Sequence, residues 1–200
     1  MFHGGDVVMW RKPGWVMLFV VSMMTGSQVM ADSLDLNLND DSMRLTYEAD
    51  MSGGMKGLLL DAGYYYNDRR SGSDADLTHV GLYVTGDNWS QSGVFNIKVG
   101  GRLIYTAVDP YDVMALGLGG DVRFSPVHRL GLGASAYYAP RIASFMDGKH
   151  YSEYGVKIDY QLLTQAFVYV GYRWMDVEVE NVGAKFKLDD SGHIGLKLLF

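Results

Sequence analysis

The chain ends on "HIGLKLLF", residues 193–200, and this stretch decides the fold class. Apolar side chains stand at every second position from Ile194 to Phe200, and the residues between them, as far as Lys197, are Gly and Lys. Successive side chains of a β-strand point to opposite faces, so this alternation predicts a strand with one apolar face. What covers that face determines what kind of protein this is.

The same period of two recurs along the whole chain, whereas no helical pattern persists over three turns. In each segment, polar residues and glycines oppose the apolar residues. The sequence therefore predicts an all-β, antiparallel fold of about ten strands, with eight to twelve as the range. The predicted strands occupy residues 34–38, 43–49, 58–66, 79–84, 94–108, 114–124, 130–138, 151–162, 166–174 and 193–200.

Two architectures accommodate such strands. In a soluble sandwich the apolar face meets a second sheet, whereas in a transmembrane β-barrel it meets lipid and the polar face lines a small lumen. Three features favour the barrel: acidic and basic residues share the polar faces, glycines recur there, and aromatic residues such as Tyr64, Tyr105 and Trp174 stand near the ends of the apolar faces. The predicted lumen charges are Arg44, Glu48, Asp61, Lys98, Arg102, Asp121, Arg123, Glu153, Lys157, Asp159 and Arg173.

The lengths of the links predict how the barrel is oriented. If Phe200 lies on the periplasmic side, the periplasmic links are all short, and the links on the other side include three long ones. This asymmetry is typical of outer-membrane barrels, and an even strand count places both termini on one side. The short links are residues 51–56, 86–91, 125–128 and 162–165, and the long ones are 67–76, 140–150 and 176–192.

The first 31 residues have the pattern of a cleaved signal peptide. Arg11 and Lys12 precede an apolar run of eleven residues, 14–24, and small residues follow as far as Ala31. Eleven helical residues at about 1.5 Å each are too short to cross a hydrocarbon layer of roughly 30 Å. We therefore expect cleavage between Ala31 and Asp32, with a signal peptide at 1–31 and the barrel at 32–200. The start of translation, Met1 or Met9, stays open.

The composition excludes several classes of protein. Loss of Arg11, Lys12 and Asp6 with the signal peptide changes the formal net charge from −6 to −7, and an acidic chain lacks the basic stripe that nucleic acid requires. No cysteine is present, so stability depends on a large core or a closed sheet rather than on disulfides. Beyond the signal peptide, no run of eighteen apolar residues predicts a membrane-spanning helix.

Four stretches of the chain resemble one known family. They are "DLNLNDDSMRL" (35–45), "GLLLDAGYYYND" (57–68), "GYRWMDVEVE" (171–180) and "GHIGLKLLF" (192–200). Over residues 32–200 the chain resembles the YfaZ-type outer-membrane proteins of Gram-negative bacteria. The resemblance implies a porin-like outer-membrane barrel of unsettled biochemical role. It also implies that the outer-membrane assembly machinery reads the terminal aromatic and its alternating partners, here Ile194, Leu196, Leu198 and Phe200.

No motif in the chain predicts a metal or cofactor site. His79, His128, His150 and His193 lack the paired spacing of metal ligands, so we expect no cofactor. The calcium-loop spacing that begins at Asp35 has Asp40 where the loop needs glycine. Two polar clusters contain the residue types of a hydrolytic triad, but none is framed by a nucleophile turn, so we expect no enzyme. The clusters are Ser144 with Asp147 and His150, and Asp190 with Ser191 and His193.

The sequence thus predicts an integral outer-membrane barrel with a structural or surface role, or with a narrow porin-like pore for small solutes. The lumen charges form either a selectivity surface or a paired filling, and for ten strands the filling is favoured because eight-strand barrels are filled by their side chains. One alternative is a soluble periplasmic barrel that binds an apolar ligand, and another is a barrel enzyme with a site on its outer loops. The expected partners are outer-membrane lipid, the secretion machinery and the assembly machinery. The oligomeric state is open, with a monomer favoured.

Overall fold

The computed structural model describes residues 33–51, 57–68, 75–90, 93–108, 111–180 and 185–200. The predicted signal peptide and its cleavage site lie outside these residues. Eleven strands are present: β1 (Ser33–Leu38), β2 (Ser42–Asp50), β3 (Leu58–Asn67), β4 (Ala75–Ser90), β5 (Gly93–Val108), β6 (Tyr111–Val127), β7 (Leu130–Ala139), β8 (Ser144–Met146), β9 (Gly148–Leu163), β10 (Ala166–Val179) and β11 (Lys185–Leu199).

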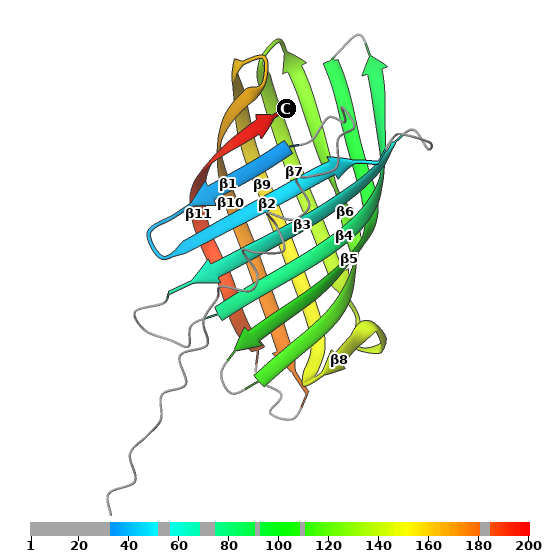
Figure 1. Cartoon of the computed structure of the whole chain (residues 1–200), viewed down its shortest axis with the longest axis vertical. Helices are drawn as coiled ribbons and strands as arrows, with labels where there is room; N and C mark the ends of the chain where they lie inside the picture. Colours follow the sequence, from blue (N-terminus) through cyan, green and yellow to red (C-terminus); the bar gives the residue numbers. More distant parts are fainter. Residues whose placement is uncertain (1–32, 52–56, 69–74, 91–92, 109–110, 181–184) are drawn as a thin grey trace, which may run out of the picture.

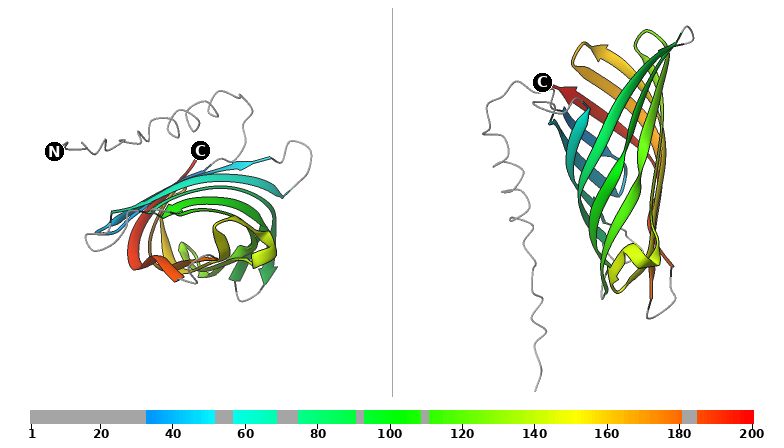
Figure 2. Two further views of the ribbon diagram at one scale, coloured as in Figure 1. Left: turned by 90° about the horizontal axis from the view of Figure 1, so that it is seen from below. Right: turned by 90° about the vertical axis from the view of Figure 1, so that its right-hand side faces the viewer.

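Ten of these strands form a closed antiparallel ring, as the alternation predicts. Each pairs with the next along the chain, β7 pairs with β9, and β1 pairs with β11 to close the barrel. The short strand β8 stands apart from this ring and pairs only with residues 113–115 of β6. Figure 1 shows the tilted strands, and Figure 2 (left) shows the ring from one end. Among the described residues, no helix has the length and apolarity needed to cross a membrane.

The barrel has two different ends. The C-terminal end holds Phe200, the start of β1 at Ser33 and the short links. The loop end is opposite, and carries the β7–β9 connection with the 3₁₀ turn at Arg141–Ala143 and β8 (Figure 1). Because the number of strands in the ring is even, β1 and β11 pair antiparallel, and Ser33 and Leu199 lie opposite each other at the same end of the barrel.

An apolar belt surrounds the middle of the barrel. Its members share an outward direction and exposure of about 40% or more, which in water would be an unusually large apolar surface. At the edge of the belt toward the loop end, tyrosine hydroxyls contact carboxylates: Tyr64 donates to Asp76 at 2.8 Å, and Tyr172 donates to Asp190 at 3.0 Å. Members of the belt include Val80, Leu82, Val84, Ile97, Val99, Leu103, Leu116, Leu118, Ile158, Val170 and Ile194.

The strands continue beyond the belt at the loop end, which differs from the prediction. Residues 176–192 were expected to form a link, but β10 extends to Val179 and β11 begins at Lys185. Their outward side chains are charged there. Asp176 pairs with Lys185 at 3.0 Å, and Glu178 accepts a hydrogen bond from Lys149 that lowers the pKa of its carboxyl.

The reason for the difference is a change of phase in the alternation. A β-bulge between Met175 and Asp176 of β10 places Leu188 of β11 in an extra, inward position. On β10 the odd-numbered positions face inward on both sides of the bulge, but the residues there change from the charged Arg173 to the apolar Met175, Val177 and Val179. The pattern therefore still has period two, but the charged face has moved to the outside.

Candidate functional site

The inward face of the barrel is the candidate site, and it has three layers along the axis. A charged layer lies across the middle, an apolar plug fills the loop end, and a cavity opens at the C-terminal end. The layers follow from the strands themselves, because every second residue of each strand points inward. On β9, for example, Tyr151 faces the plug, Glu153 lies in the charged layer and Lys157 lines the cavity.

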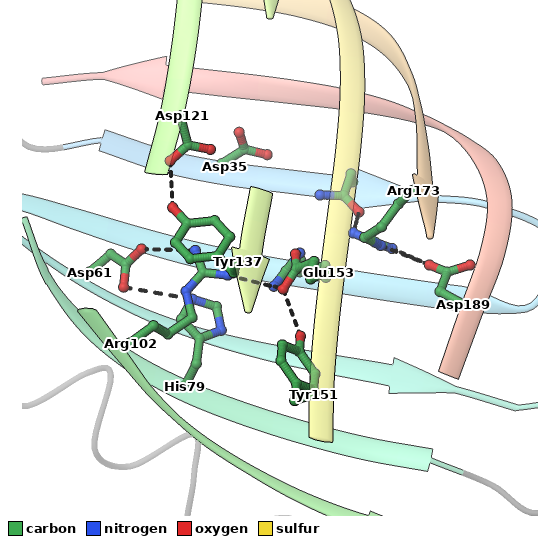
Figure 3. A network of polar contacts seen from close by, with 12 residues as sticks. Asp35, Asp61, His79, Arg102, Asp121, Tyr137, Tyr151, Glu153, Arg173 and Asp189 are labelled. Atoms are coloured by element: carbon green, nitrogen blue, oxygen red, sulfur yellow. Dashed lines mark hydrogen bonds and ion pairs between the residues drawn. The ribbon is translucent and has the colours of Figure 1, made fainter. Parts of the chain in front are cut away.

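Glu153 is the centre of the charged layer (Figure 3). Its carboxylate accepts hydrogen bonds from Arg44 Nη1 at 2.6 Å, from Arg102 Nη1 at 3.1 Å and from the Tyr151 hydroxyl at 2.7 Å. All four side chains are buried. Because Arg44 is on β2 and Arg102 is on β5, this one carboxylate connects three walls of the barrel across the lumen.

Asp61 and two tyrosines complete the surroundings of Arg102. The guanidinium donates from Nη2 to Asp61 Oδ2 at 3.4 Å and from Nε to the Tyr83 hydroxyl at 2.9 Å. Its Cζ lies 3.9 Å from the centre of the Tyr137 ring, which is a close cation–π contact. Beside Asp61, the fully buried His79 places Nε2 3.8 Å from the carboxylate. Arg102 is therefore surrounded by a carboxylate, a hydroxyl and an aromatic ring.

Lys98 links this layer to the cavity. Its ammonium lies 2.9 Å from Glu48 and 3.1 Å from Asp121, and Glu48 also accepts a hydrogen bond from Lys197. Asp121 in turn accepts from the Tyr137 hydroxyl at 2.5 Å. Each of these charges thus has an opposite charge or a hydroxyl within reach.

Two further ion pairs lie on the inward face, outside the network around Glu153. Arg173 contacts Asp189 at 2.7 Å and donates to Asn37 Oδ1 at 3.2 Å, and its Cζ lies 4.8 Å from the ring of Tyr65. Nearer the C-terminal end, Arg123 pairs with Asp159 at 2.5 Å. These contacts join β10 to β11 and β1, and β6 to β9.

An apolar plug closes the loop end of the lumen. Residues with essentially no exposure come together here from eight strands and form a continuous core, although the outside of the barrel at this level is charged. Tyr111 and Phe186 pack against it, with ring centres 6.1 Å apart. In the described part of the chain, buried apolar side chains therefore fill this end of the lumen where a pore would need polar ones. The plug consists of Tyr65, Ala75, Leu77, Ile104, Val113, Ala115, Ala139, Tyr151, Met175, Val177, Val179 and Leu188.

The cavity at the C-terminal end has a volume of about 300 Å³ and ends on the charged layer. Its floor includes Arg44, Arg102 and Glu153, and its walls include Lys157 and Lys197. The lining is polar and charged, and the charges largely neutralise one another. A space of this kind admits water and small polar solutes from the C-terminal end.

The structure places all eleven predicted lumen charges on the inward face. It brings most of them into the network around Glu153, Asp61 and Glu48, whereas the Arg123–Asp159 and Arg173–Asp189 pairs stand apart. Lys157 contacts the Tyr169 ring, with Nζ 5.0 Å from its centre. Sequence reasoning missed the inward rings of Tyr65, Tyr83 and Tyr151, and the acid Asp189, whereas the alternation of residues 130–138 already places Tyr137 on the inward face. These tyrosines stand at the inward-facing positions of their strands, so counting every second residue along each strand would have found them.

The two candidate triads are not assembled. Ser144 donates to the carbonyl of Pro140 at 3.1 Å, while His150 contacts the hydroxyl of Tyr138 at 3.3 Å. In the second cluster, Ser191 donates to Asp189 at 2.5 Å, and the ring of His193 packs edge-on against Tyr169. In the described ranges of the chain, no three His, Asp or Glu residues are grouped as metal ligands.

Comparison with known proteins gives one family and several similar folds. The family model described as YfaZ precursor matches residues 15–200. No curated protein matches the sequence. A structure of the KdgM porin resembles this one with 13% sequence identity and a TM-score of 0.45, over 86% of this chain and 99% of that chain.

Two more solved structures are similar at lower TM-scores. OmpT, an outer membrane protein of Vibrio cholerae, has 15% identity and a TM-score of 0.34. The outer membrane channel DcaP of Acinetobacter baumannii has 12% identity and a TM-score of 0.36. The match covers 84% of this chain in both cases, but only 64% and 62% of the other two chains.

Replacement of Glu153 by Gln tests the charged layer. The substitution keeps the shape but leaves the Arg44 and Arg102 guanidiniums without their shared counter-charge, and breaking a buried ion pair in this way costs about 3–5 kcal/mol. We expect the folded barrel of this variant to unfold at clearly lower denaturant concentration, measured by the loss of heat-modifiable gel mobility in urea. The control is Glu180→Gln, which removes an exposed carboxylate at the rim and should leave the midpoint unchanged. Equal midpoints for the two variants would contradict the role of Glu153.

Proposed function

Because the chain belongs to the YfaZ family and its closed barrel carries an outward apolar belt, it is an exported outer-membrane β-barrel protein, and we propose that the barrel is a filled scaffold that presents its loop end at the cell surface. The observation that carries this proposal is the apolar plug. A pore needs a polar path from one end to the other, and the inward residues of the loop end are apolar and closely packed. Porins of 16 to 18 strands leave an aqueous channel, whereas an eight-strand barrel is filled by its own side chains, and the ten strands of this ring are nearer to the second case.

The lumen charges support filling rather than selectivity. In a selective channel, some charges face the path of the solute without a protein partner. Here Arg102, Glu153 and Asp61 are buried and bonded to one another. Ion pairs of this kind contribute little net stability, but they fix how the walls face each other, because a displaced strand would leave a buried charge unpaired.

The alternatives have less support. A soluble barrel that binds an apolar ligand needs an apolar interior cavity, whereas the cavity is lined by charges and the apolar surface is outside. For an enzyme on the outer loops, the Ser and His side chains of each cluster would have to be bonded, and their contacts go to other residues. We therefore propose a role without catalysis.

We further propose that residues 1–31 direct export and are removed after Ala31, and that the assembly machinery reads the C-terminal strand. The description of the family as a precursor supports the first part. The second is supported by the position of Ile194, Leu196, Leu198 and Phe200, whose side chains are exposed on the outside of β11 and just beyond its end.

Single-channel recording tests the filled lumen. We expect wild-type protein in planar bilayers to give no stable conductance steps, because the apolar plug fills the loop end of the lumen. A variant with Leu77, Met175 and Leu188 all replaced by Ala thins the plug and should give frequent brief openings. Val80→Ala/Leu82→Ala/Val84→Ala, which changes the outer belt instead, is the control and should stay silent. Regular, long-lived steps from the wild-type protein would refute the proposal.

Deletion of Phe200 tests the assembly signal. The ring is about half exposed, so its loss removes little packing, but it removes the terminal aromatic that the machinery is proposed to read. We expect unchanged export and a several-fold lower assembled fraction in the outer membrane, measured by heat-modifiable mobility. Phe145→Ala, which removes an equally exposed ring at the loop end, is the matched control. Normal assembly of the deletion variant would show that the ring is not read.

A further inference from the structure

The barrel wall has a notch where β1 is too short. β1 pairs with residues 194–199 of β11, and the turn after Leu38 then leads into β2. The rest of β11, from Lys185 to His193, has no strand beside it on that edge in the described part of the chain. Side chains replace the missing strand: the Tyr65 hydroxyl and Asn67 Nδ2 donate to the carbonyl of Leu188 at 3.1 and 2.8 Å.

This notch joins the inside of the barrel to its outer surface. It has a volume of about 690 Å³. Inward residues such as Asp189 and His193 line it together with outward ones such as Val170 and Ile194. His193 also lines the cavity at the C-terminal end, so it stands between the two spaces.

The notch presents acceptors that lack donors. Asp189 and Asp190 are paired with Arg173 and Lys187. For the Asp40 and Asp41 carboxylates, the described residues supply no ion pair or hydrogen bond. Asn67 is only 4% exposed and lines the notch, and its Oδ1 has no hydrogen-bond partner within the described ranges. The site is therefore negative and rich in acceptors, which complements a cation that carries N–H groups.

An apolar groove continues from the notch along the outer surface. It has a volume of about 610 Å³ and shares Leu38, Val170 and Ile194 with the notch. From there it extends toward the middle of the belt past Leu36 and Leu196. Its lining is almost entirely apolar, and it faces the hydrocarbon, so an acyl chain is the occupant that fits it.

The two spaces have the correct order for a membrane amphiphile. In the register of β10 and β11, Tyr172 is opposite Gly192 and Trp174 is opposite Asp190, so the notch lies at the aromatic edge of the belt. Aromatic belts mark the level of lipid headgroups. The polar notch is thus at headgroup depth, and the groove lies at acyl-chain depth.

We propose that this notch and groove form a binding site for an amine-bearing membrane amphiphile, with the ammonium beside Asp40, Asp41 and Asn67 and one acyl chain along Ile194 and Leu196. The proposal rests on the membrane location stated above, but not on whether the lumen conducts. An ammonium satisfies the free acceptors, while an anionic headgroup of the same size would be repelled by the two carboxylates.

Native mass spectrometry of the delipidated barrel tests the site. The probes are palmitoyl lysophosphatidylethanolamine, lysophosphatidylcholine and lysophosphatidylglycerol, added singly and in competition. We expect one retained equivalent, with the ethanolamine lipid preferred over the glycerol lipid by about tenfold. The choline lipid should fall between them, because it carries the charge but has no N–H to donate to Asn67. Equal retention of the ethanolamine and glycerol lipids would overturn the proposal.

Variants separate the headgroup from the chain, and each is used only if it keeps heat-modifiable mobility. Asp40→Asn/Asp41→Asn should abolish the preference, and Asp40→Lys/Asp41→Lys should reverse it toward the glycerol lipid. Ile194→Trp fills the groove and should reduce retention of all three lipids, whereas Val84→Trp, on the outer face of β4, should not. An unchanged preference in both Asp variants would show that these carboxylates do not bind the headgroup.

Discussion

A closed ring of strands confines every second side chain to an interior of fixed width, and this constraint determines the rest of the structure. Ten strands leave a lumen that long side chains can bridge, so a charge on one wall meets its partner on another. Glu153 on β9 reaches Arg44 on β2 and Arg102 on β5, and these two contacts span the barrel. The interior is then filled by its own residues, and the exterior is left for lipid.

The polarity of the wall reverses where the barrel leaves the apolar belt. Within the belt, charged residues face in and apolar residues face out. Beyond the bulge at Met175, apolar residues such as Val177 face in and acids such as Glu178 face out. The loop end is therefore built like a soluble barrel with a core, joined to a membrane barrel with a polar lumen. This combination explains how a wall can extend past the membrane and still be closed.

Much of this architecture follows from the sequence, because alternation is a local property. The outward apolar residues, the inward charges and the ring of ten strands were all predictable from period two. The longer strands were not predicted, since "DVEVE" (176–180) was interpreted as part of a polar link, although its apolar residues alternate in the opposite phase to those before it. Partners across the lumen, such as Arg44 with Glu153, depend on how the ring closes, which no single strand encodes. The notch beside β11 follows from the shortness of β1 relative to its neighbours, which is visible only once the strands are paired.

The most direct test of a filled loop end at the cell surface is cysteine labelling of intact cells. The reagent is a maleimide attached to a polymer too large to pass through porins. The chain has no cysteine of its own, so single substitutions report cleanly. Ile142, at the loop end, is 90% exposed, and Val177, in the plug, is fully buried. The account predicts rapid labelling of Ile142→Cys and labelling of Val177→Cys only after unfolding. Labelling of both residues at the same rate would show that the loop end is open to the outside.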